Sequence, residues 1–199
     1  MNKREQNSSK LRKLAITGIL CGVMLFLALT DIAVISIPPA NMSFCCVPII
    51  IGTLVCGLDT GLILSAIFGL SSVWKAFSAP SALIIPLMGV NPVYVIIMSV
   101  GARLLIPIFA HLVFKALRKH EKTSIALSAL AGSVTNTVFY LGLMLLFYTM
   151  AGLDSAAVLG VIAGVGALNG SLEAVAAVVV CTPVVIALTN IFHKKKQQA

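Results

Sequence analysis

Long apolar stretches, separated by short polar or proline-rich segments, dominate the pattern of the chain. A transmembrane helix needs about 20 mostly apolar residues, because it rises about 1.5 Å per residue through a hydrocarbon layer about 30 Å thick. We therefore expect an all-α membrane protein, a six-transmembrane-helix bundle that forms one domain over residues 1–199. The second and third helices are short, and the predicted ranges are about 11–30, 43–57, 61–75, 91–117, 123–150 and 156–192.

Two long connectors between these helices are apolar as well as rich in proline. The first, Asp31–Met42, contains Pro38-Pro39, and the second, Lys75–Gly89, contains two prolines and ends in glycine. Proline lacks a backbone donor and interrupts helices, so both segments are predicted to be loops. An apolar loop at a membrane face either lies in the lipid interface or covers a cavity, and we favour the covering role for the second loop.

The charged residues predict how the bundle is oriented. Lys and Arg cluster at 3–13, 115–122 and 194–196, whereas Asp31 and Asp154 fall on the other side of the predicted bundle. Basic clusters that flank apolar spans mark cytoplasmic ends under the positive-inside rule. We therefore expect both termini to be cytoplasmic (N-in and C-in) and the two long loops to share the outer face.

The composition agrees with a multi-pass protein of the cell membrane. The chain is 59% hydrophobic and 10% charged, with a mean hydropathy of +1.07, which leaves too little polar surface for a soluble domain. The net charge of +8 does not indicate nucleic-acid binding, because the positive residues flank membrane spans. The lipid bilayer is the expected partner, and each basic residue near an anionic surface contributes about 1 kcal/mol.

The predicted fourth helix carries Arg103 inside its apolar run. Arg103 lies roughly 18 Å from Asn91 along the helix, past the middle of the hydrocarbon layer. A central Arg costs about 3 kcal/mol on insertion scales, so it should face protein or water and have a partner. Pro107, four residues later, cannot donate to the Arg103 carbonyl and predicts a kink. A functional site and a structural Arg paired with another helix are equally good interpretations.

Other polar residues fall at a similar predicted depth. Asn169 and Glu173 lie one turn apart on the last helix, and Asn136 is near the middle of the fifth. For the two asparagines we favour a buried pocket for a small, partly polar solute, and for Arg103 with Glu173 an ionic clamp between helices. The aromatic candidates for the outer half of the pocket are Tyr94 and Tyr140, whereas Trp74 and Tyr148 are assigned to an interfacial belt.

Several motifs of enzymes and metal sites are absent. The sequence has no G-x-x-x-x-G-K-[ST] and no H-E-x-x-H, and its three histidines lie far apart. The five cysteines sit in apolar surroundings and are read as small packing residues. Catalytic residues, a metal site and a bound cofactor are therefore not expected.

A series of short segments resembles one known family in order and spacing, over residues 12–190. These segments are LAITGILCG in the first helix, VPIIIG at 47–52, GLILSAIFG at 61–69, Asn91-Pro92 followed by Arg103, TNTV at 135–138 and NGSLEA at 169–174. No single segment is diagnostic. Together they resemble the substrate-binding S component of energy-coupling factor (ECF) vitamin transporters, in its pantothenate-type branch.

The resemblance implies a six-helix bundle that captures a vitamin at the outer face. The expected partners are a coupling transmembrane subunit and two cytoplasmic ATPase subunits, which would hydrolyse ATP, so this chain is not expected to be an enzyme. The best candidate substrate is pantothenate, with pyridoxine or a thiamin precursor as alternatives. The implied substrate-binding set is Asn91, Tyr94, Arg103, Asn136, Tyr140, Asn169 and Glu173.

The same resemblance assigns a docking role to small residues of the first helix. Family members meet the coupling subunit through an A-x-x-x-A-like motif, and the matching positions here are Ala15, Gly18 and Gly22. The pattern Gly18-x-x-x-Gly22 alone favours packing within the bundle over docking to another subunit. A small integral-membrane enzyme and a small channel or assembly factor are the alternatives from other functional classes.

Overall fold

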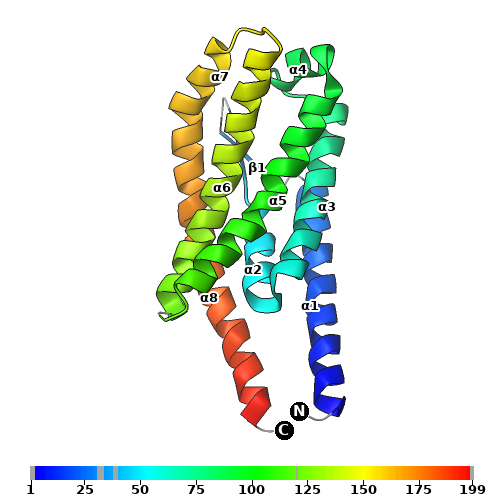
Figure 1. The fold of residues 1–199 in the computed structure, drawn as a ribbon, viewed down its shortest axis with the longest axis vertical. Coiled ribbons are helices and arrows are strands. Elements are labelled where there is room, and N and C mark those ends of the chain that lie inside the picture. Colours follow the sequence, from blue (N-terminus) through cyan, green and yellow to red (C-terminus); the bar gives the residue numbers. More distant parts are fainter. Residues whose placement is uncertain (1–2, 31–33, 38–39, 120, 198–199) are drawn as a thin grey trace.

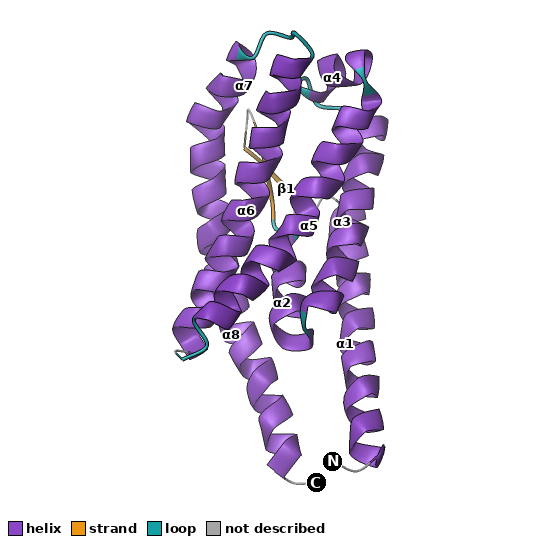
Figure 2. Cartoon of the chain, viewed as in Figure 1, coloured by secondary structure: helices purple, strands orange, loops and turns teal. Residues whose placement is uncertain are grey.

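The computed structural model describes residues 3–30, 34–37, 40–119 and 121–197, which are predominantly helical (Figures 1 and 2). The elements in chain order are α1 (Lys3–Thr30), β1 (Val34–Ile37), β2 (Ala40–Ser43), α2 (Cys46–Cys56), α3 (Leu58–Ser78), α4 (Ile84–Val90), α5 (Pro92–Ala116), α6 (Glu121–Met150), α7 (Ala156–Val161), the π-helical segment η1 (Ile162–Gly166) and α8 (Ala167–Gln197).

Five of these helices are long and apolar enough to cross a membrane, whereas six were predicted. They are Lys10–Thr30, Leu58–Ser78, Pro92–Ala116, Glu121–Met150 and Leu168–Ile191 among the described residues. The remaining apolar helix, α2, has 11 residues and would span only about 16 Å. It ends at Gly57, whose φ of +98° is accessible to glycine at little cost, and α3 begins at the next residue instead of at Gly61.

Both predicted loops contain regular structure. In the first, Val34 pairs with Ser43 and Ile37 with Ala40 in a short antiparallel hairpin, while Asp31 and Pro38-Pro39 lie outside the described residues. In the second, α3 continues to Ser78 and α4 replaces the loop that was predicted up to Gly89. Pro86 is compatible with α4 because it lies in the first turn, where backbone N–H groups have no partner within the helix.

The long helices pack side by side, and α2 lies among them. α5 contacts α3 and α6, α6 contacts α8, and α1 packs on α3, while α2 touches α3, α5 and α8. Ile49 and Ile50 of α2 and Leu64 of α3 are fully buried in this core. A Cβ atom on Gly61 would lie 2.7 Å from the Cβ of Pro107, so glycine permits the close approach of α3 and α5.

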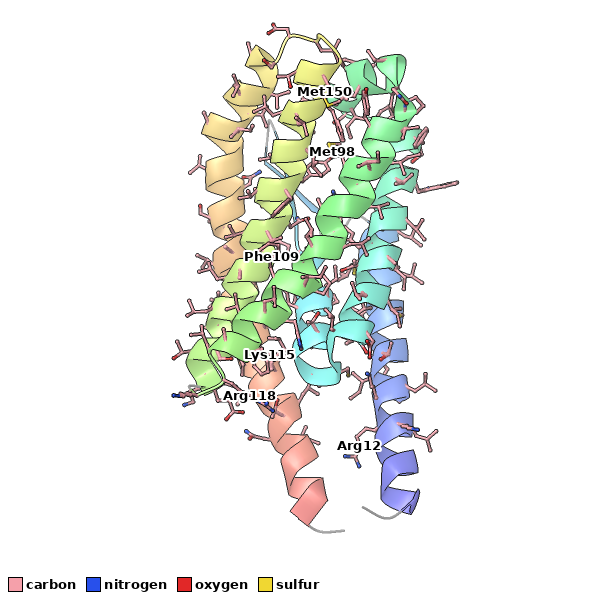
Figure 3. All side chains as sticks on the ribbon, viewed as in Figure 1. Arg12, Met98, Phe109, Lys115, Arg118 and Met150 are labelled. Atoms are coloured by element: carbon pink, nitrogen blue, oxygen red, sulfur yellow. The ribbon has the colours of Figure 1, made fainter. Side chains whose placement is uncertain are left out.

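Both chain ends lie at one end of the bundle, together with the turn between α5 and α6 (Figure 1). We call this the terminal end and the opposite one the α4 end. Figure 3 shows Arg12, Lys115 and Arg118 near the terminal end and Met150 at the α4 end. The segments that carry the basic clusters thus share one end of the fold, as the predicted orientation requires.

Candidate functional site

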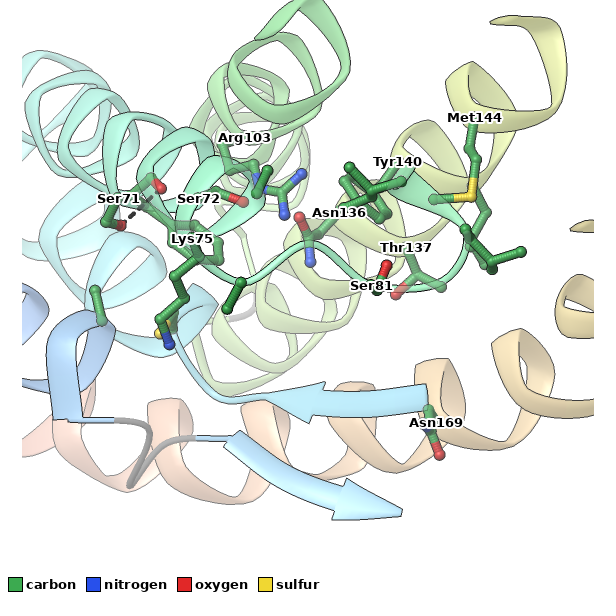
Figure 4. A pocket seen from close by; sticks show the side chains of 18 of the residues that line it. Ser71, Ser72, Lys75, Ser81, Arg103, Asn136, Thr137, Tyr140, Met144 and Asn169 are labelled. Atoms are coloured by element: carbon green, nitrogen blue, oxygen red, sulfur yellow. Dashed lines mark hydrogen bonds between the residues drawn. The ribbon is translucent and has the colours of Figure 1, made fainter. Parts of the chain in front are cut away.

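A cavity of about 810 Å³ lies among α3, α5, α6 and α8 and extends to the segment before α4 (Figure 4). Each of the four helices contributes polar side chains to an otherwise apolar wall. Five of the seven predicted substrate-binding residues line it: Arg103, Asn136, Tyr140, Asn169 and Glu173. Helices with widely separated positions in the sequence therefore bring these side chains to one cavity.

Arg103 is held between aromatic rings on the wall of the cavity. Its side chain is 7% exposed, and its Cζ lies 4.2 Å from the ring centroid of Tyr140 and 5.1 Å from that of Phe68. Its Nε and Nη1 atoms are buried and have no hydrogen-bond partner. Cation–π contacts stabilise the charge in part, but two buried donor atoms remain without a hydrogen-bond partner, which is a costly arrangement.

The predicted ionic clamp between Arg103 and Glu173 is not formed as a direct contact. No ion pair within 4.0 Å joins these two side chains in the described part of the chain. Glu173 is buried and lines the same cavity as Arg103. The two residues therefore line the same cavity from α5 and α8 without a direct ion pair between them.

The two predicted asparagines of the pocket lie on facing helices. Asn136 on α6 and Asn169 on α8 are both buried and both line the cavity. The Oδ1 atom of Asn136 is buried without a hydrogen-bond partner. Figure 4 shows Asn136 beside Arg103 and Asn169 on the opposite side of the space. Next to the unused donors of Arg103, the cavity thus offers at least one unused acceptor.

Asn91 and Tyr94, the other two predicted substrate-binding residues, are not among the residues that line the cavity. The Asn91 side chain accepts a hydrogen bond of 3.0 Å from the backbone N–H of Val93 and so caps the start of α5. The ring of Tyr94 stacks on Phe147 with a centroid distance of 4.8 Å. Both residues stabilise the α4 end, one through the backbone and the other through ring packing.

The segment that precedes α4 forms part of the cavity wall. Ser81 and Leu83 line the cavity, and the Tyr148 hydroxyl donates a hydrogen bond to the Leu83 carbonyl. Tyr148 is 4% exposed, so its assignment to an interfacial belt is wrong, whereas Trp74 is 69% exposed. This hydrogen bond ties the segment that precedes α4 to α6.

The polar face of α3 was missed in the sequence. Ser71, Ser72 and Lys75 line the cavity, as does Thr137 of α6. The only available signal was the spacing, since polar residues separated by three or four positions in an apolar helix share a face. The sequence pattern of such a face is the same whether the face points to lipid or to the interior of the bundle.

Ala15, Gly18 and Gly22 lie on an exposed face of α1. A Cβ atom built on either glycine would meet no other atom of the described chain within 4 Å. α1 instead uses a different stripe against the bundle, where the Thr17 and Thr60 hydroxyls lie 3.1 Å apart and Met24 is fully buried. The prediction that these glycines pack within the bundle is therefore wrong.

A family model described as "ECF transporter, substrate-specific component" matches residues 12–185. No curated protein matches the chain. The match extends from α1 to α8 and includes every helix that contributes to the cavity.

Proposed function

Because the chain belongs to the family of ECF transporter substrate-specific components, we propose that its cavity captures a small vitamin with a carboxylate group, with pantothenate as the best candidate. Membership makes the chain the substrate-binding subunit of a transporter and a multi-pass membrane protein rather than an enzyme. The proposal concerns which class of solute it takes and which residues hold it.

The single observation that carries the proposal is the state of Arg103. Its Nε and Nη1 donors are buried without a hydrogen-bond partner, and the residue lines the cavity. A carboxylate accepts two parallel hydrogen bonds from a guanidinium, and such charge-assisted bonds are about twice as strong as neutral ones. Pantothenate carries a carboxylate, whereas pyridoxine and the pyrimidine precursor of thiamin do not. The available donors therefore favour pantothenate among the three.

The remaining cavity groups suit the rest of such a ligand. The Asn136 Oδ1 atom needs a donor, which an amide N–H or a hydroxyl group supplies. Asn169 and Glu173 add polar groups from α8, and Met144 and Leu141 of α6 add apolar surface. A small solute with one carboxylate, one amide and a short branched carbon skeleton matches this combination.

The uptake step is proposed to depend on partner subunits that dock on α1. The exposed face with Ala15, Gly18 and Gly22 provides the close helix approach that small residues allow in membranes. We propose that a coupling transmembrane subunit binds this face and that two ATPase subunits supply the energy from the cytoplasm. The basic clusters support a cytoplasmic position for both termini under the positive-inside rule.

The substrate assignment is tested by identifying the small molecule that co-purifies with the protein, using mass spectrometry, and by calorimetry with pantothenate and pyridoxine. We expect pantothenate in the purified protein and saturable binding of pantothenate only. Binding of pyridoxine alone would contradict the role given to Arg103. Chemical turnover of either vitamin by the isolated chain would revive the enzyme alternative.

Asn169→Ala should weaken pantothenate binding by about 5- to 10-fold, because one hydrogen bond in a buried site contributes about 1 kcal/mol. The measurement is calorimetry on purified protein. Asn190→Ala is the matched control, since Asn190 lies on the same helix but is exposed and does not line the cavity. Both variants should keep the wild-type unfolding temperature. Unchanged affinity in Asn169→Ala would remove this residue from the site.

Tyr148→Phe should release bound vitamin faster, by about 3- to 10-fold, because it removes the hydrogen bond from the Tyr148 hydroxyl to the Leu83 carbonyl in the segment before α4. Stopped-flow dissociation of a labelled vitamin measures the rate. Tyr94→Phe is the control, because the ring at position 94 keeps its stack on Phe147 and loses only its hydroxyl group. Equal dissociation rates in wild type and Tyr148→Phe would show that the segment does not limit exit.

A further inference from the structure

We propose that α3 carries a second subsite, formed by Ser71, Ser72, Lys75 and Ser78, which binds an uncharged, hydroxyl-bearing end of the ligand. This α3 subsite deepens the proposed function and rests on it, since the carboxylate end is assigned to Arg103. All four residues line the cavity. Ser71, Lys75 and Ser78 follow one another at spacings of four and three, which places them on one face of the helix.

The hydrogen bonds of Ser71 and Ser78 limit what the α3 subsite can recognise. The Ser71 hydroxyl donates to the Phe68 carbonyl at 2.9 Å, and the Ser78 hydroxyl donates to the Trp74 carbonyl at 2.9 Å. Their protons are therefore engaged with the helix, and their oxygens are left as acceptors. Lys75 contributes a donor. A ligand hydroxyl both accepts and donates, so it matches this set.

A phosphate group would match the α3 subsite poorly. Phosphate oxygens need several donors, but the Ser71 and Ser78 protons already bond to backbone carbonyls. The described charged residues of the cavity wall are Lys75, Arg103 and Glu173. With the carboxylate at Arg103, the other end of the ligand is expected to be neutral.

The separation of the two subsites sets the length of the ligand. Arg103 lies over Phe68 of α3, with its Cζ 5.1 Å from the ring centroid. Lys75 is seven residues further along the same helix, a rise of about 10 Å. Figure 4 shows Ser71, Ser72 and Lys75 on one wall and Arg103 with Asn136 next to it. The ligand therefore carries its carboxylate and its hydroxyl groups at opposite ends of an extended chain.

Calorimetry with two probes tests the proposal: pantothenate, and its dideoxy analogue, which keeps the carboxylate and the amide but lacks both hydroxyl groups. Wild-type protein should bind pantothenate about 10-fold more tightly than the dideoxy analogue, because a hydrogen bond to a charged group is worth roughly that factor or more. Lys75→Met should lose this preference, because it lowers the affinity for pantothenate and leaves the affinity for the analogue unchanged. Ser78→Ala should reduce the preference about 3-fold, as expected for a neutral hydrogen bond.

The controls separate failure of this subsite from failure of the function. Lys115→Met removes an exposed cation near the other end of the bundle and should bind both probes as wild type does. Equal affinities of wild-type protein for the two probes, or equal losses for both probes in Lys75→Met, would overturn the α3 subsite while the carboxylate site stands. Absence of binding of either probe to wild-type protein would instead overturn the proposed function. Unfolding temperatures of all variants show that each is folded.

Discussion

Arg103→Met should reduce the affinity for pantothenate by at least about 100-fold, because it removes two charge-assisted hydrogen bonds of roughly 1.5–3 kcal/mol each. The same substitution should raise the unfolding temperature of the ligand-free protein. Arg103 is 7% exposed, and two of its nitrogens have no hydrogen-bond partner, so folding includes a desolvation cost that the aromatic contacts offset only in part. Met removes that cost and occupies a similar length. Calorimetry and thermal unfolding measure the two effects.

The opposite signs of these effects distinguish a binding Arg from a structural one. A structural Arg would lose stability when replaced, since its partners would be left unsatisfied. Arg103→Lys is the matched control, because it keeps the charge but lacks the planar fork that binds a carboxylate with two bonds. We expect it to bind with intermediate affinity. Wild-type affinity together with lower stability in Arg103→Met would return this residue to a purely structural role.

Gly18→Leu and Gly22→Leu should abolish uptake and co-purification with the coupling subunit while leaving vitamin binding unchanged. A Cβ atom at either position meets nothing within 4 Å in the described chain, so the leucine side chains cost no packing inside the subunit. In a complex they would hold the partner helix away from the small-residue face and prevent close contact. Vitamin uptake in cells, pull-down of the partner and calorimetry on the isolated chain measure the three properties.

Gly142→Leu is the matched control for the α1 variants. Gly142 lies on α6 and is exposed, and a Cβ atom added to it would likewise meet no atom of the described chain within 4 Å. The variant changes the same residue type to the same larger one on another helix, so it should leave uptake and assembly intact. Normal assembly in both α1 variants would mean that the coupling subunit binds elsewhere.

The prediction of helices from sequence succeeded where apolar length dominated. The ranges 91–117 and 123–150 differ from α5 and α6 by at most two residues at each end, because long apolar runs leave few alternatives in a bilayer. It failed for the segment before Asn91, where Pro80, Pro86 and Gly89 indicated a loop. A helix can accept proline in its first turn, so α4 forms there.

The candidate site could be predicted only in part. Arg103, Asn136 and Glu173 stood out because polar groups in an apolar helix are costly and must face protein or a cavity. Asn91 and Tyr94 were equally polar candidates, yet one caps a helix and the other stacks on Phe147. Such roles depend on neighbours that no spacing in the sequence identifies.

The sequence by itself determined the apolar helices and their number to within one, because these properties depend on local composition and on a rise of about 1.5 Å per residue. Only the tertiary structure decided which faces meet. It brought α3 to the cavity wall, left the Gly18 and Gly22 face of α1 uncovered, and placed Arg103 against Tyr140 instead of Glu173. Contacts between distant helices arise from side-chain packing, which no local pattern encodes.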